Sequence, residues 1–234
     1  MTGMLASVNS LQEAQLALDA QVDIIDLKQP SKGALGALEI DLIKTIVTAI
    51  NGVCPISATI GDLPMQPDNV FKAVDDMVNT GVDFVKIGFF PDGDWLATLQ
   101  KLHSHTDRWQ QQRTGLIAVL FADTQPDLAI LSTLKNSGFK GVMLDTMDKQ
   151  KGSLTQVMAH AKVTQFVKLA RQHQLLCGLA GSLKANDIAK LMPLNPDYLG
   201  FRGALCNQHN RTSQLNQSAV IKIKQAIKQV TLNK

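Results

Sequence analysis

The sequence predicts a (β/α)8 barrel of the TIM type, an α/β fold formed as a single domain by residues 1–234. Three observations predict it. Eight short apolar runs alternate with longer segments of helical periodicity, which is the order of elements in a parallel α/β protein. The length of 234 residues is close to the roughly 250 residues of such a barrel. Charged residues also end strand after strand, as expected where the carboxyl ends of barrel strands meet.

The apolar runs are the predicted strands, and they comprise residues 5–8, 23–27, 56–60, 84–89, 116–121, 142–144, 175–180 and 198–201. Periodicity does not detect closure of a sheet, so an open doubly wound sheet is the alternative. The repeated placement of charge at the strand ends favours the barrel, because its catalytic face lies there.

The predicted helices include residues 11–20, 40–50, 70–79, 126–136, 164–173 and 220–230. Ser10 is an N-cap candidate for the first of them, with Glu13 three residues later as in a capping box. Gly81 and Gly138 fall between a helix and a strand, where a C-terminal cap is expected.

Six of the predicted strands end in aspartate, lysine or arginine. A single charge at a strand end is usually a solvated rim residue. Six together predict a shared site, because charges in otherwise buried strands are costly unless they are paired. The residues are Asp26, Lys28, Asp62, Lys86, Asp123, Asp145 and Arg202.

Lys28 is the predicted covalent nucleophile, and Lys86 is a second amine of the same site. Asp26 and Lys28 are two residues apart on a strand and therefore share a face. Desolvation or a second positive charge lowers the pKa of a lysine and supplies free amine. That amine can attack a carbonyl and form a Schiff base, an electron sink for carbon–carbon bond chemistry. Asp26, Asp62 and Asp145 are expected to balance charge and move protons; the alternative for each is a salt bridge without chemistry.

A phosphate site is predicted after strands seven and eight. Gly181, Ser182, Arg202 and Gly203 follow these strands, and small residues there let backbone N–H groups approach a phosphate. Arg202 adds charge and a fork of donors. Residues 32–36, which hold two glycines, do not form a Walker A motif and are interpreted as a mobile loop over the site.

The composition argues against several other classes of protein. A formal net charge of +3 with 5% aromatic residues provides no basic groove with stacking side chains, so no nucleic-acid partner is expected. Three widely spaced cysteines predict neither a disulfide framework nor a zinc site. No membrane span and no secretory signal are found, so a cytoplasmic location is expected.

Two further groups of residues are expected to lie away from the chemistry. The five histidines fall on predicted helices and late loops and are interpreted as surface residues; they are His103, His105, His160, His173 and His209. Lys222, Lys224 and Lys228 are interpreted as the solvated face of the last helix. The sequence leaves open whether the protein forms a homo-oligomer.

The motifs at the strand ends resemble those of (5-formylfuran-3-yl)methyl phosphate synthases. The resemblance runs in order from Leu5 to about Arg211 and includes several motifs of six residues or more. The motifs are Asp23-Ile-Ile-Asp-Leu-Lys28-Gln-Pro30 with Gly33 and Leu35-Gly36, Ser57-Ala-Thr-Ile-Gly-Asp62, Asp83-Phe-Val-Lys86-Ile-Gly88, Met143-Leu-Asp145-Thr146 with Lys149, Leu179-Ala-Gly-Ser182, and Gly200-Phe-Arg-Gly203. Residues 101–114 and 207–211 depart from the pattern of the family.

The resemblance implies a TIM-barrel lyase that joins two molecules of glyceraldehyde 3-phosphate, with loss of phosphate and water, into a furan aldehyde phosphate for methanofuran or methylofuran synthesis. It implies that Lys28 is the Schiff-base lysine and Lys86 the proton-transferring lysine. Asp26, Asp145 and Lys149 match supporting positions of the active site. The family uses no metal and no organic cofactor, so none is expected here.

Three other functions remain open from the residues alone. A different Schiff-base aldolase or a metal-free sugar-phosphate isomerase would use the same rim, and the fold does not separate them. A barrel that binds phosphometabolites without catalysis is a second alternative, although binding alone needs no paired amines. A structural or partner-binding protein is the third, but the chain has no heptad repeat that would support it.

Overall fold

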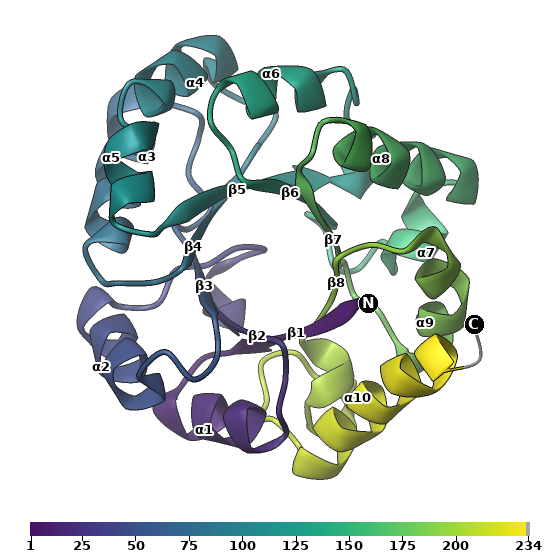
Figure 1. Cartoon of the computed structure of the whole chain (residues 1–234). Helices are drawn as coiled ribbons and strands as arrows, with labels where there is room; N and C mark the ends of the chain where they lie inside the picture. Colours follow the sequence, from purple (N-terminus) through teal and green to yellow (C-terminus); the bar gives the residue numbers. More distant parts are fainter. Residues whose placement is uncertain (233–234) are drawn as a thin grey trace.

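The chain forms a closed barrel of eight parallel strands surrounded by helices (Figure 1). The computed structural model describes residues 1–232. Each strand pairs in parallel with the next along the chain, and β8 pairs with β1 to close the sheet. The strands are β1 (Gly3–Val8), β2 (Ile24–Leu27), β3 (Ile56–Thr59), β4 (Phe84–Gly88), β5 (Gly115–Phe121), β6 (Gly141–Asp145), β7 (Leu176–Leu179) and β8 (Tyr198–Phe201).

The helices form the outer layer and follow the strands in turn. They are α1 (Leu11–Asp19), α2 (Ile40–Ile50), α3 (Pro67–Val78), α4 (Trp95–His103), α5 (Thr106–Gln111), α6 (Ile130–Asn136), α7 (Leu154–Val157), α8 (His160–Gln172), α9 (Ala185–Leu191) and α10 (Gln217–Leu232). Short 3-10 turns lie at Pro30–Lys32, Ala122–Thr124, Met192–Leu194, Gly203–Leu205 and Asn207–His209. No helix among residues 1–232 is long and apolar enough to cross a membrane.

Burial on both faces explains why the strands are almost continuously apolar. One hydrophobic cluster fills the space between the barrel and the helices, and it includes Ile25, Leu27 and Ile43. A smaller cluster that includes Leu5 and Phe121 packs separately from it. The polar residues of the strands are the exceptions to this pattern, and most of them gather at one end of the barrel. They are buried where other strand positions carry aliphatic side chains.

The predicted fold class and all eight predicted strands are confirmed, with strand ends displaced by at most two residues. The helices α4, α5, α7 and α9 lie outside the predicted helical ranges. Gly138 directly follows Ser137, the C-cap of α6, and has a φ of 84°, as expected at the end of a helix. Gly81 has a φ of 86° but lies two residues after Asn79, the C-cap of α3.

Two local expectations are only partly right. The Ser10 hydroxyl caps α1 by accepting from the Glu13 N–H at 3.2 Å, but the Glu13 carboxylate is not held back at the Ser10 N–H. It accepts from the Asn9 N–H and pairs with Arg202. On α10, Lys222 and Lys228 are exposed, whereas Lys224 pairs with Asp23 at 2.5 Å and does not belong to a purely solvated face.

Candidate active site

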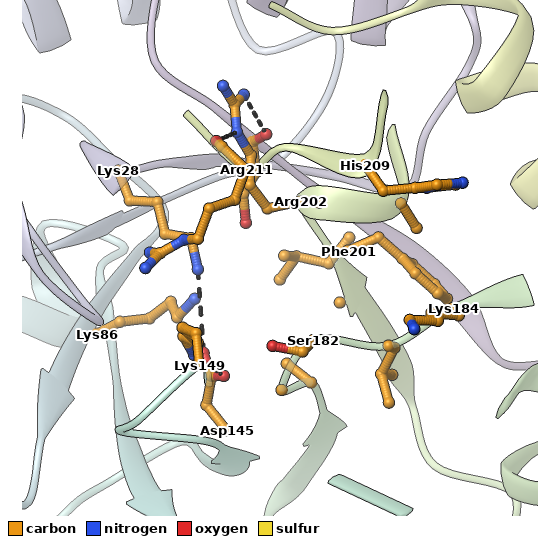
Figure 2. A pocket seen from close by; sticks show the side chains of 18 residues that line it. Lys28, Lys86, Asp145, Lys149, Ser182, Lys184, Phe201, Arg202, His209 and Arg211 are labelled. Carbon is orange, nitrogen blue, oxygen red and sulfur yellow. Dashed lines mark hydrogen bonds and ion pairs between the residues drawn. The ribbon is translucent and has the colours of Figure 1, made fainter. Parts of the chain in front are cut away.

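A cavity of about 260 Å³ opens at the carboxyl ends of the strands. Residues from β1, β4, β6 and β8 and from the loops after β2, β6, β7 and β8 line it (Figure 2). Its wall contains six basic side chains and one carboxylate, that of Asp145. The basic residues are Lys28, Lys86, Lys149, Lys184, Arg202 and Arg211. A cavity with this excess of positive charge suits an anionic ligand.

Asp26 and Lys86 form a fully buried ion pair beneath this cavity. The Lys86 Nζ lies 2.9 Å from Asp26 Oδ1. Both carboxylate oxygens of Asp26 also accept hydroxyl hydrogen bonds, from Ser57 at 2.7 Å and from Ser7 at 2.7 Å. The parallel register explains this meeting, because Asp26 pairs with Ser7 on β1 and with Ser57 on β3. Burial would raise the pKa of Asp26, but the charges of Lys86 and Lys28 outweigh it and the pKa lies below its ordinary value.

Lys28 and Lys149 share the carboxylate of Asp145. Lys149 Nζ donates to Asp145 Oδ1 at 2.6 Å and also contacts the carbonyl of Thr146. Lys28 Nζ lies 3.9 Å from the other oxygen, Oδ2. The amine of Lys28 is therefore held close to a counterion without a short hydrogen bond to it. Burial would raise the pKa of Asp145, but Lys149 and Lys28 outweigh this and hold it well below the ordinary value.

The pKa of Lys28 is lowered from 10.5 to about 8. Burial is the main cause, since it disfavours the ammonium form. The positive charges of Lys149 and Lys86 lower the pKa further, while the carboxylates of Asp145 and Asp26 oppose them. Crowding by Lys86 and desolvation were the two causes predicted from the sequence. In the structure desolvation comes first, and Lys149 lowers the pKa of Lys28 more strongly than Lys86 does.

Gly181, Ser182 and Gly203 line the opposite side of the cavity. Gly181 and Ser182 have φ values of 102° and 48°, so two successive residues adopt positive φ. A side chain on Gly181 would meet Thr146 at 2.9 Å, which explains the glycine. Among residues 1–232, the N–H groups of Ser182, Leu183, Gly203 and Ala204 have no acceptor. Free N–H groups on turns of this kind are suited to binding an anion.

Arg202 lines the cavity, but its guanidinium forms hydrogen bonds to other residues of the protein. Nη1 and Nη2 form a fork with the Glu13 carboxylate, with a shortest distance of 2.5 Å. The remaining contacts go to backbone carbonyls, of Arg211 at 2.8 Å, Ser7 at 3.1 Å and Ser213 at 2.9 Å. The predicted contact between Arg202 and a phosphate stays a prediction, and it would require some of these bonds to break.

Asp62 and Asp123 each hold a loop of the active-site face. The Asp62 carboxylate accepts the N–H groups of Ala34 and Leu35 at 2.8 and 2.6 Å. Asp123 accepts those of Met147 and Asp148 at 2.7 and 2.8 Å. Asp62 is not part of the cavity wall, so a direct contact with substrate stays a prediction. Its carboxylate orders the loop after β2, and Asp123 orders the loop that carries Lys149.

Three ionisable residues of the cavity wall are missing from the predicted site: Lys184, His209 and Arg211. The expectation that all five histidines lie away from the site is wrong for His209, because the loop after β8 folds back over the strand end. A signal for Arg211 was its position in the loop after the last strand. Among the described residues, no group of three His, Cys, Asp or Glu side chains could hold a metal ion.

Comparison with known proteins identifies the family. The family model described as 4-HFC-P synthase matches residues 4–224. The chain belongs to this family. A putative (5-formylfuran-3-yl)methyl phosphate synthase of Methylorubrum extorquens is 37% identical over 225 residues, covering 96% of this chain and 91% of that protein. The (5-formylfuran-3-yl)methyl phosphate synthase of Methanococcus maripaludis is 30% identical over 226 residues, covering 94% and 96%.

The 4-HFC-P synthase family member shares its fold with other barrel proteins of known structure. KGPDC from Streptococcus mutans superposes with a TM-score of 0.71 at 13% identity and covers 98% of each chain. The 3-hexulose-6-phosphate synthase from Salmonella typhimurium superposes with a TM-score of 0.69 at 16% identity, covering 97% of this chain and 99% of that one. At such identities the likeness shows the fold alone. The family membership, by contrast, makes this chain a relative of known enzymes.

Proposed function

We propose that this protein joins two molecules of glyceraldehyde 3-phosphate into (5-formylfuran-3-yl)methyl phosphate, through a Schiff base on Lys28. The observation that carries the proposal is a buried amine with a pKa lowered to about 8 in a cationic cavity. Such an amine is partly unprotonated near neutral pH and can attack an aldehyde. Membership of the 4-HFC-P synthase family supports the choice of substrate and product.

In the first step, the lone pair of Lys28 Nζ adds to the aldehyde carbon, C1, of one triose phosphate. Loss of water from the adduct gives an iminium. The iminium acidifies C2, and a base removes the C2 proton so that the C–H electron pair becomes an enamine. Lys86 is assigned this proton transfer, because it borders the cavity and contacts Asp26 at 2.9 Å. Lys86 passes its own proton to the Asp26 carboxylate, and its free amine then accepts the proton from C2.

In the second step, the enamine electrons form a C2–C3 double bond while the C3–O bond breaks and phosphate leaves. The remaining iminium carries an enol, whose C3 is nucleophilic. It adds to the carbonyl carbon of the second triose after that triose has isomerised to the ketone. The terminal hydroxyl of the second triose then closes the ring, and two molecules of water are lost as the furan forms. Hydrolysis of the iminium returns the Lys28 amine, so the balance is one phosphate and two waters lost.

The phosphate that the product retains belongs to the second triose. Gly181, Ser182 and Gly203 are proposed to hold it through backbone N–H groups, because the free donors of this face lie on their turns. Asp145 and Lys149 are proposed to set the charge around Lys28, since all three groups are joined by contacts of 2.6 and 3.9 Å. The product would serve a cytoplasmic pathway to a methanofuran-type carrier.

Product identity tests the proposal. The protein is incubated with glyceraldehyde 3-phosphate, and inorganic phosphate and near-ultraviolet furan absorbance are followed together. We expect both to form in step in the wild type and in Lys222→Ala, which removes an exposed lysine of α10, and neither to form with Lys28→Ala. A coupled six-carbon sugar phosphate without a furan would indicate an aldolase, and interconverted triose phosphates would indicate an isomerase; either result contradicts the proposal.

A further inference from the structure

Arg211 is a cation of the cavity that the mechanism above does not use. It lies in the loop after β8, lines the cavity and is half-buried. Its Nη2 donates to the carbonyl of Gly33 at 2.9 Å. Among residues 1–232, this is the one hydrogen bond of its guanidinium, and no carboxylate lies within ion-pair distance of it. A half-buried guanidinium with unused donors is prepared to bind an anion.

The backbone around Arg211 is held by a buried ion pair. Arg202 donates from Nε to the carbonyl of Arg211 at 2.8 Å and from Nη2 to the carbonyl of Ser213 at 2.9 Å. Its partner Glu13 accepts the N–H of Leu215 at 2.9 Å. The two arginines therefore have different tasks. Arg202 is a positioning residue that fixes the loop, and Arg211 is the guanidinium that the loop presents to the cavity.

The direction of the two side chains agrees with this division. In Figure 2 the Arg211 side chain runs toward the amine of Lys28, whereas the Arg202 guanidinium points away from it. Ser182 and Lys184 lie across the cavity from Arg211. The cavity thus has anion-binding features on two sides: the backbone N–H groups at Ser182, and the Arg211 guanidinium on the side of Lys28.

We propose that Arg211 binds the phosphate group that leaves the triose held on Lys28. This inference rests on the proposed function, in which one phosphate departs and the other is retained. Two phosphate-bearing substrates need two anion subsites, and the turns at Ser182 and Gly203 supply one. Arg211 supplies the other, next to the covalent amine, and also joins the loop of Gly33 to the loop after β8 through its Nη2 contact.

The step that Arg211 assists is the β-elimination. The enamine electron pair forms the C2–C3 double bond, and the C3–O electron pair leaves on the phosphate oxygen. That oxygen takes up the proton removed from C2, so the group departs as hydrogen phosphate. Arg211 does not transfer the proton. Its N–H groups bond to the non-bridging oxygens and stabilise the charge that develops on the leaving group.

The composition of the borohydride-trapped adduct tests this role. Borohydride reduces the Schiff base on Lys28 during reaction with glyceraldehyde 3-phosphate. The trapped adduct either still carries the phosphate of the triose or has lost it, and the intact mass separates these two adducts. We expect Arg211→Gln to shift the ratio toward the phosphate-bearing adduct by about tenfold or more, the effect of losing hydrogen bonds to a charged group. Arg211→Lys should lie between Arg211→Gln and the wild type. Arg171→Gln is the matched control, because Arg171 also donates one Nη2 bond to a carbonyl, that of Asn195, outside this cavity.

An unchanged adduct ratio in Arg211→Gln would overturn the inference, as would an equal loss of both adducts, which would place Arg211 in binding of the first substrate. If the wild type itself yields no adduct and no furan, the proposed function fails. The anion subsite is then judged by titration with inorganic phosphate, followed by phosphorus NMR. The wild type and Arg171→Gln should bind one more phosphate than Arg211→Gln, and equal stoichiometry in all three proteins would contradict the subsite.

Discussion

Replacing Lys149 by methionine is expected to raise the pH at which Lys28 becomes a nucleophile. Lys149 and Lys28 contact the two oxygens of the Asp145 carboxylate at 2.6 and 3.9 Å, so their nitrogens are roughly 5–8 Å apart. At an effective dielectric constant of about 20, two like charges at this separation repel by about 2–3 kcal/mol. Solvent in the open cavity screens part of this repulsion. We therefore expect the pKa of Lys28 to rise by about one unit, from about 8 toward 9.

The size of the effect follows from the fraction of free amine. At pH 7 a lysine with a pKa of about 8 is about 10% unprotonated, whereas one with an ordinary pKa is unprotonated to only about 0.03%. A rise of one unit in Lys149→Met should lower the initial rate of adduct formation about tenfold at pH 7 and leave the rate at pH 10 nearly unchanged. Lys149→Arg keeps the charge and should retain the wild-type profile.

The assay is the initial rate of borohydride-trapped adduct on Lys28, measured by intact mass between pH 6 and 10 at saturating glyceraldehyde 3-phosphate. The half-maximal pH should lie near 8 for the wild type and Lys149→Arg, and near 9 for Lys149→Met. A Lys149→Met profile with the wild-type midpoint and a uniformly lower rate would contradict an effect of Lys149 on the pKa of Lys28. It would show that Lys149 acts in binding or proton transfer and not through the charge of Lys28.

Three further substitutions have expected outcomes. Lys28→Met should raise the free energy of unfolding at pH 7, measured by urea denaturation, by up to about 3 kcal/mol. The pKa of Lys28 is lowered in the folded state, so the unfolded chain binds the proton more tightly than the folded chain does. The cost of burying the ammonium is therefore full below about pH 8 and disappears as the pH rises toward 10.5. Glu13→Gln leaves the Arg202 guanidinium buried without its counterion and should lower the free energy of unfolding by about 3–5 kcal/mol; an unchanged value would show that solvent reaches the arginine. Asp62→Asn loses the carboxylate that accepts two N–H groups of the loop after β2. Hydrogen exchange of the Ala34 and Leu35 amides should become at least tenfold faster than in the control Asp19→Asn, which changes the exposed face of α1. Equal exchange in the two variants would contradict the role of Asp62.

The barrel was predictable because each strand is buried on both faces and its polar residues stand out at one end. Lys28, Lys86 and Asp145 interrupt otherwise apolar strands, and the strand period places them on the inner face. The parallel register then brings Asp26 against Ser7 and Ser57. These contacts follow from the order of the strands, so a correct prediction of the barrel also predicts which residues meet at the centre of the site.

The loops were less predictable, because several partners compete for each charged group. Arg202 follows β8 as a phosphate-binding arginine would, but Glu13 on α1 pairs with it, and 189 positions separate the two in sequence. The Arg202–Glu13 pair also holds the loop after β8, and this loop presents Arg211 to the cavity. Asp62 was similarly ambiguous, since a carboxylate that binds substrate and one that holds a loop look alike at a strand end.

The proposed function depends on one covalent event, the formation of a Schiff base on Lys28, and trapping this adduct is the decisive experiment. The protein is incubated with glyceraldehyde 3-phosphate and borohydride, its intact mass is recorded, and the modified residue is located by peptide mapping. We expect a reduced triose adduct on Lys28, with phosphate and a furan released in the unreduced sample. An adduct on another lysine, or furan formation that persists in Lys28→Ala without any adduct, would contradict it.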